Sequence, residues 1–187
     1  SVFHKLDVSC YESDLKPHQR FLIDHDLYNT FDVEGDYATA ERVDRVYTNP
    51  TIKPATWKPQ LKVISLDTES DEAGNLYCIG LYTKGYQKNF MITDKKLTNA
   101  VSCKDEEECL EKVKAELIRL DPDIITGWNV IGFDFVYLQG LYKKHRIPFD
   151  IGRTNGNTRL RIEGNFFKTS TAEVPGRQVL DGLSLLK

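Results

Sequence analysis

The sequence lacks the features that would place this chain in a membrane or around a zinc ion. No apolar run is long enough to span a bilayer, and the first residues do not form a signal peptide. The cysteines form no Cys-x-x-Cys pair, so zinc is not indicated and reduced thiols are expected. A net charge of -3 argues against binding nucleic acid by bulk electrostatics. These absences predict a cytoplasmic chain with no membrane partner.

The composition is that of an ordinary globular protein. With 187 residues, 40% of them hydrophobic and 28% charged, the chain suits one domain or slightly more. A strand is predicted over residues 2–11 and a helix near 17–24. Prolines at positions 50, 54 and 59 make residues 47–60 an extended connector. We therefore divide the chain into residues 1–59 and residues 60–187.

Residues 60–187 show alternating strand and helix patterns. Strands over 76–82 and 87–92 are predicted to form a hairpin around Lys84-Gly85. Residues 105–120 form the clearest helix, with Ser102 or Asp105 as its cap. The apolar stripe of that helix consists of Leu110, Val113, Leu117 and Leu120. A mixed α/β sheet with flanking helices follows from this order of elements.

A pair of carboxylates follows a short apolar run at residues 61–66. The run is rich in β-branched residues and is typical of a buried strand that ends near Asp67. Asp67 and Glu69 are two positions apart, so on a strand they share a face. Two like charges held close together favour a hard cation such as Mg²⁺ or Mn²⁺. Taken alone, the pair is equally compatible with a solvated strand end.

A second group of polar residues follows the apolar dipeptide Ile124-Ile125. Beyond it a helix is predicted over about residues 132–145, ended by Pro148. Its expected apolar stripe is made by Phe133, Val136, Tyr137 and Leu141, with Leu138 alongside. Asp134 then lies in the first turn, where the helix dipole favours a carboxylate. From there it is also placed to complete a metal site with Asp67 and Glu69.

These two groups resemble the exonuclease motifs of family B DNA polymerases. Asp67-Thr68-Glu69 resembles the first motif, Asp-x-Glu, and residues 129–134 match the second, Asn-x-x-x-Phe-Asp, without a gap. Residues 11–23 are similar to the segment that such polymerases carry before the exonuclease domain, and residues 66–81 are similar to bacterial members in particular. Thr68 and Ser70 depart from the usual pattern, an apolar residue and a threonine.

The resemblance implies a ribonuclease H-like fold preceded by part of a polymerase N-terminal domain. It implies the 3′–5′ proofreading exonuclease region of a DNA-directed DNA polymerase, with two Mg²⁺ or Mn²⁺ ions held by Asp67, Glu69 and Asp134. Substrate-binding roles fall to Thr68, Asn129 and Phe133, although Asn129 could instead cap the helix and Phe133 could be core. The expected partners are a single-stranded DNA 3′ end, primer–template DNA, the remainder of the polymerase chain and a sliding clamp.

The family's third motif, Tyr-x-x-x-Asp, does not occur after Asp134. His145 and Asp150 have the His-x-x-x-x-Asp spacing of a related exonuclease class, but His145 lies on the same predicted helix as Asp134. We therefore expect an exonuclease domain truncated before its third motif. Two alternatives stay open: a DNA-binding fragment that hydrolyses nothing, and a stand-alone RNA-trimming exonuclease.

The end of the chain is locally basic. Residues 143–187 carry nine basic residues against four acidic ones. Within them, Arg159 and Arg161 alternate with apolar residues like a strand, and Phe166 and Phe167 follow a turn. This pattern indicates either a solvated surface or a hairpin, over about residues 158–177, that separates DNA strands.

Overall fold

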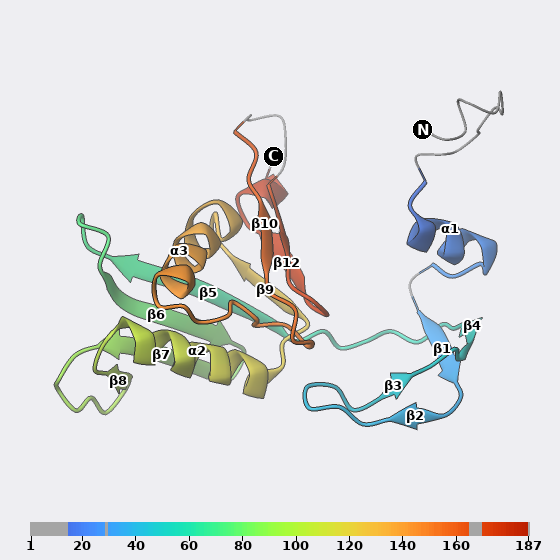
Figure 1. Ribbon diagram of the computed structural model, residues 1–187, viewed down its shortest axis with the longest axis horizontal. Coiled ribbons are helices and arrows are strands. Elements are labelled where there is room, and N and C mark those ends of the chain that lie inside the picture. Colours follow the sequence, from blue (N-terminus) through green and yellow to red (C-terminus); the bar gives the residue numbers. More distant parts are fainter. Residues whose placement is uncertain (1–14, 29, 165–169, 187) are drawn as a thin grey trace. The chain divides into compact units, whose positions relative to one another are not determined.

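The computed structural model describes residues 15–28, 30–164 and 170–186, which form two compact units (Figure 1). The units are Ser1–Gln60 and Leu61–Lys187. The predicted strand over residues 2–11 lies outside the described residues. In the described part of the chain, no helix combines the length and the apolarity needed to cross a membrane.

The described residues of the first unit, 15–28 and 30–60, form one helix and two short antiparallel pairs of strands. The helix α1 (Pro17–Asp24) lies where the sequence predicted it, with Pro17 in its first turn. β2 (Tyr37–Ala38) pairs with β3 (Val46–Tyr47), and β1 (Phe31–Glu34) pairs with β4 (Thr51–Pro54).

The expectation that residues 47–60 contain no element was wrong, because β4 lies within them. Pro50 precedes β4 and Pro54 is its last residue, opposite Phe31. Proline is compatible with a strand at such terminal positions, where its missing N–H removes little pairing. The prolines therefore bound a short strand rather than exclude one.

The second unit is built on a six-stranded mixed sheet with the order β12-β9-β5-β6-β7-β8. The central strand β5 pairs antiparallel with β6 and parallel with β9, and β12 pairs parallel with β9. The predicted hairpin is confirmed as β6 and β7, joined at Lys84-Gly85. The strands are β5 (Val63–Ser70), β6 (Leu76–Thr83), β7 (Tyr86–Ile92), β8 (Val101–Cys103), β9 (Ile124–Gly127) and β12 (Gln178–Asp181).

Two helices, α2 (Glu106–Leu120) and α3 (Val136–Lys144), cover one face of this sheet, as Figure 1 shows. The cap of α2 is Asp105, whose side chain accepts a hydrogen bond from the N–H of Glu108 at 2.9 Å. The buried Tyr142 of α3 donates its hydroxyl to the carbonyl of Leu110 on α2 at 2.9 Å. The helices are thus attached to each other as well as to the sheet.

The core lies between these helices and the sheet. Along β5, Ile64, Leu66 and Thr68 are buried toward the helices, while Val63, Asp67 and Glu69 are exposed on the other face. The core side chains from α2 are Cys109, Leu110, Val113 and Leu117, so the stripe predicted for this helix is confirmed, with Leu120 partly buried. A sheet buried on one face leaves the alternate residues of β5 open to solvent.

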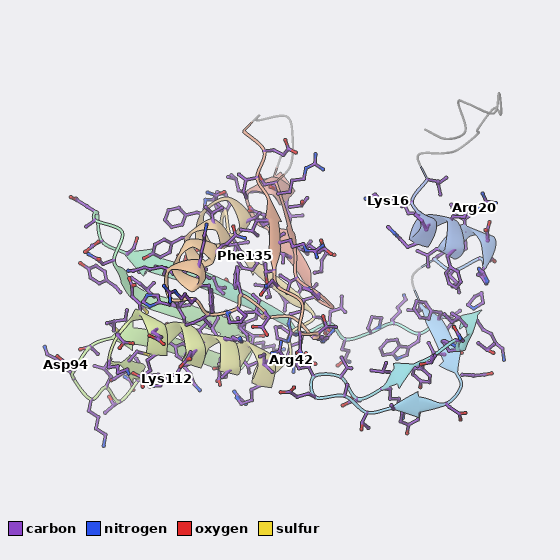
Figure 2. The ribbon with its side chains drawn as sticks, viewed as in Figure 1. Lys16, Arg20, Arg42, Asp94, Lys112 and Phe135 are labelled. Atoms are coloured by element: carbon purple, nitrogen blue, oxygen red, sulfur yellow. The ribbon has the colours of Figure 1, made fainter. Side chains whose placement is uncertain are left out.

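Helix α3 begins with a π-helical turn, η2 (Ile131–Phe135), and this shifts its apolar face. The expected stripe is confirmed at Tyr137, Leu138 and Leu141, which pack in or against the core, and was wrong at Phe133 and Val136, whose side chains are exposed. Phe135 is instead fully buried and packs edge-on against Phe149; it is labelled beside α3 in Figure 2. A π-helical turn inserts a residue relative to α-helical spacing, so periodicity projected through it selects the wrong face.

The remaining elements lie near the end of the chain. β10 (Arg159–Arg161) and β11 (Thr171–Glu173) form an antiparallel pair, so the strand predicted at Arg159 is confirmed. A short 3-10 helix, η3 (Ser184–Leu186), follows β12. Phe166 and Phe167, predicted to follow a turn within this hairpin, lie outside the described residues.

Candidate active site

Asp67 and Glu69 occupy the second half of β5, where the strand has a neighbour on one side only. β6 pairs with both of them, through Gly80 and Cys78, but the ladder to β9 stops at Ser65. β5 runs on to Ser70, so the carboxylates lie inside the strand rather than at its end. The prediction that they share a face is confirmed, because both are exposed on the face that the helices leave open.

Asp134 reaches β5 from the opposite face. It lies in the π-helical turn, with only 2% of its surface exposed. The N–H and the hydroxyl of Thr68 both donate to Asp134 Oδ1, at 2.9 Å and 2.7 Å. Asp134 of the second motif is therefore hydrogen-bonded to Thr68, the residue between Asp67 and Glu69.

The environment of Asp134 disfavours its charged form. Burial raises the pKa of this carboxyl above its ordinary value, and the negative charge of Asp67 raises it further. The two hydrogen bonds from Thr68 act in the opposite direction, because they stabilise the ionised carboxylate. Asp67 and Asp134 are thus near enough for their charges to interact.

The three carboxylates do not form a ready metal site in this arrangement. Within residues 15–28, 30–164 and 170–186, no group of three His, Cys, Asp or Glu side chains is positioned to hold a metal ion. Asp67 and Glu69 project from the open face, whereas Asp134 is held on the side of Thr68. The structure brings the predicted residues to the same segment of β5 without converging all three on one point.

Asn129 shapes the entry into the π-helical turn. It adopts a left-handed backbone conformation (φ 53°), and its carbonyl accepts a hydrogen bond from the N–H of Phe133 at 2.9 Å. A Cβ placed on Gly132 would lie 2.6 Å from Asn129 Oδ1, so a larger residue at position 132 would force the amide of Asn129 to shift. The side chain of Asn129 does not cap the helix.

A residue that the sequence did not single out provides the cap. Asp181, the last residue of β12, is buried and accepts a hydrogen bond from the N–H of Ile131 at 2.9 Å through Oδ2. Its Oδ1 accepts from the N–H groups of Leu183 and Ser184, at 3.0 Å and 3.3 Å. Asp181 therefore joins the sheet to the start of the turn that carries Asp134. The sequence pattern that could have pointed to Asp181 is an aspartate that directly follows an apolar strand and precedes a glycine.

The comparisons with known proteins decide the family. A family model described as "DNA polymerase family B, exonuclease domain" matches residues 62–187. The chain belongs to this family. The resemblance inferred from the two motifs is thereby confirmed.

Two similar proteins support this assignment. DNA polymerase II of Escherichia coli (strain K12) is 35% identical over 191 residues, which cover 96% of this chain and 23% of that protein. A DNA polymerase of Archaeoglobus fulgidus is 28% identical over 168 residues, covering 80% of this chain and 19% of its own length. The chain thus spans a quarter or less of these relatives.

A solved structure agrees with the fold. The family B DNA polymerase from the hyperthermophilic archaeon Pyrobaculum calidifontis matches with a TM-score of 0.71 and 21% identity, over 96% of this chain and 23% of that one. The expected ribonuclease H-like mixed sheet with flanking helices is confirmed.

The alternative His145–Asp150 pair is engaged elsewhere in this exonuclease domain. His145 Nε2 lies 2.8 Å from Glu106 Oε2, so the imidazole attaches α3 to the start of α2. The carboxylate of Asp150 pairs with Lys114 of α2. Both side chains belong to the packing of the helices, away from β5.

Much of the basic excess of residues 143–187 is neutralised inside the domain. Arg177 is buried and donates to Asp121 Oδ1 at 2.8 Å, and Arg153 binds both Asp121 and Asp123. On the predicted hairpin, Arg161 pairs with Glu163 at 2.8 Å. The net charge of the sequence here therefore overstates the positive charge available to a DNA strand.

Proposed function

We propose that this chain is the proofreading 3′–5′ exonuclease region of a DNA-directed DNA polymerase. The reaction is hydrolysis of the 3′-terminal phosphodiester of single-stranded DNA, which releases a nucleoside monophosphate. The observation that carries the proposal is the attachment of Asp134 to Thr68, which brings the second-motif carboxylate against the first-motif strand. Family membership supports the nuclease class.

The chemical type of the donors, rather than their present arrangement, fits divalent metal ions. Asp67, Glu69 and Asp134 supply hard carboxylate oxygens, which suit Mg²⁺ or Mn²⁺. The mutual repulsion of Asp67 and Asp134, which contributes to the raised pKa of Asp134, is what a bound cation would relieve. In the complete site, these carboxylates would hold two such ions, which would supply an activated water and stabilisation of the leaving oxygen. Asp67 would contribute to both ion positions, Glu69 to one and Asp134 to the other.

The other site residues would act on the strand or on the ligands. Thr68 holds Oδ1 of Asp134, so the second oxygen of that carboxylate is not engaged by Thr68. A direct contact of Thr68 with substrate stays a prediction. Phe133, 52% exposed next to Asp134, is available to pack against a terminal base or sugar. Asn129 would hydrogen-bond the substrate strand.

Several predictions on partners belong to the whole protein. Primer–template DNA, the remainder of the polymerase chain and a sliding clamp are proposed partners of the longer protein. The strand-separating role of Arg159, Arg161, Phe166 and Phe167 also stays a prediction. A DNA-binding fragment without hydrolysis remains the competing function, favoured by the separation of Asp134 from the face that carries Asp67 and Glu69.

The test is the double variant Asp67→Ala/Glu69→Ala in the full-length protein. It should abolish degradation of 3′-labelled single-stranded DNA and leave primer extension largely intact. Glu72→Ala is the matched control, since it removes an exposed carboxylate just beyond β5 and should retain degradation. Undiminished degradation by the double variant would exclude these residues from catalysis. Absence of degradation by the wild-type protein would favour the binding fragment.

A further inference from the structure

Trp128 has no role in the function proposed above, yet it is one of the most exposed large side chains of the exonuclease unit. Its exposed fraction is 64%, although it directly follows the buried core strand β9. Burying an indole removes a large apolar area from water, so an exposed tryptophan that directly follows the strand next to β5 is suited to pack against a ligand.

β5 and β9 approach closely just before the first-motif carboxylate and Trp128. β5 and β9 pair as Val63 with Ile124 and Ser65 with Thr126. The ladder ends at this second pair, and Trp128 lies in the turn that directly follows β9. A Cβ placed on Gly127 would lie 2.5 Å from the carbonyl oxygen of Leu66, so β5 and β9 still approach closely at the residues that precede Trp128 and Asp67.

The indole is also supported from behind. Gly182, just after β12, donates its N–H to the carbonyl of Gly127 at 2.9 Å. A Cβ on Gly182 would lie 3.6 Å from Cε3 of Trp128, so one edge of the ring rests near a residue that has no side chain. The neighbouring backbone at Gly182 limits the movement of the ring. The rest of the ring is exposed to solvent and is therefore available to a ligand.

The nearby charges select the type of ligand. Without bound cations, Asp67 and Glu69 repel the phosphates of a DNA strand, so an attractive contact that does not depend on phosphate charge is useful here. Stacking of a base on an aromatic ring supplies such a contact and tolerates every base, as removal of any mispaired nucleotide requires. The exposed ring of Phe133 lies five positions further along the same loop and turn.

We propose that Trp128 is a stacking platform for one base among the last three nucleotides at the 3′ end of a single DNA strand. This inference rests on the proposed exonuclease function and adds a binding subsite to it. Trp128 would hold the strand across the edge of the sheet, with its phosphodiester over Asp67.

The first measurement compares steady-state kinetics of Trp128→Ala and wild-type full-length protein on single-stranded oligonucleotides. KM should rise about 5- to 150-fold, the loss expected for one stacked base, with kcat changed by less than about twofold. Trp128→Phe, which keeps a ring, should fall between the two. Trp57→Ala is the matched control, because Trp57 is similarly exposed (68%) but belongs to the first unit.

The second measurement finds the stacked base without relying on hydrolysis. Oligonucleotides with 2-aminopurine at each of the last three positions are bound in EDTA, and quenching at one position should be lost in Trp128→Ala. An abasic residue at that position should abolish the KM difference between Trp128→Ala and wild type.

Three results would overturn the stacking role while leaving the exonuclease function intact. The first is a KM of Trp128→Ala equal to that of the wild type. The second is a rise in the KM of Trp128→Ala that is equally large on the abasic substrates, wherever the abasic residue lies. The third is a raised KM together with a lower melting temperature, both of which Trp128→Phe shares. A wild-type protein that neither binds nor degrades single strands would overturn both the subsite and the proposed function.

Discussion

Thr68→Val tests whether the contact between the two exonuclease motifs matters for metal binding. Valine has nearly the shape of threonine but lacks the hydroxyl that donates to Asp134 Oδ1 at 2.7 Å. The backbone N–H of residue 68 keeps its own bond to the same oxygen, at 2.9 Å in the wild type. Asp134 therefore stays attached to β5 but is oriented by one donor instead of two.

The size of the effect follows from what is lost. Removing a hydrogen-bond partner of a metal-ligating side chain lowers metal affinity or activity by about 10- to 100-fold. Because the backbone donor remains, we expect the lower end of this range, about tenfold, in the apparent affinity for Mn²⁺ or Mg²⁺. The free energy of unfolding should fall by about 1–2 kcal/mol, since the lost bond joins a hydroxyl to a buried carboxylate.

The assay measures exonuclease rate against Mn²⁺ concentration, together with the metal-induced rise in melting temperature, which does not depend on turnover. The midpoint of both curves should shift to higher metal concentration, and the KM for DNA should stay unchanged. Thr68→Ser keeps the hydroxyl and should restore the wild-type midpoint. Superimposable curves for Thr68→Val and wild type, or a Thr68→Ser variant as weak as Thr68→Val, would refute the reasoning.

Three further predictions concern the support of the site and its completeness. Asp181→Ala leaves the N–H groups of Ile131, Leu183 and Ser184 without their acceptor, so the free energy of unfolding measured in urea should fall by about 2–4 kcal/mol. Asp181→Asn keeps one oxygen and should lose less stability. Equal losses for the two variants would contradict the capping role. Glu116 has a pKa lowered from 4.5 to about 2, mainly by its hydrogen bond from Arg119, so its stabilising effect is present above pH 4.5 and is lost as the pH falls toward 2. Glu116→Gln should therefore lower the melting temperature at neutral pH and approach the wild-type value near pH 2; a difference of equal size at both pH values would argue against this. Residues 1–187 alone, which lack the third motif, should degrade single strands far more slowly than the full-length protein even in excess Mn²⁺; robust magnesium-dependent digestion by this chain would show that the third motif is dispensable.

Local interactions explain why several elements could be predicted from the sequence. The cap of α2 joins Asp105 to Glu108, three residues away, so its pattern is contained in a short window. The β6–β7 hairpin likewise depends on adjacent strands and the turn at Gly85, whose positive φ favours glycine. The shared face of Asp67 and Glu69 follows from the two-residue repeat of any strand.

Local patterns failed where tertiary contacts overrode them. The prolines of residues 47–60 suggested a connector, yet β4 forms there because β1 supplies its partner. The apolar stripe predicted for residues 132–145 assumed α-helical spacing from the first turn. The π-helical turn at Ile131–Phe135 changes that spacing, and it buries Phe135 instead of Phe133.

The carboxylates of the candidate site, and the strand and turn that carry them, could be predicted from the residues alone. How these segments meet depends on contacts between distant positions: Thr68 and Asp134 are 66 positions apart, and Ile131 and Asp181 are 50 apart. These contacts exist because β5, β9 and β12 lie side by side in parallel, which aligns the ends of segments that are distant in the chain. No periodicity within one segment encodes that alignment, so the attachment of Asp134 and its cap by Asp181 emerged only from the folded sheet.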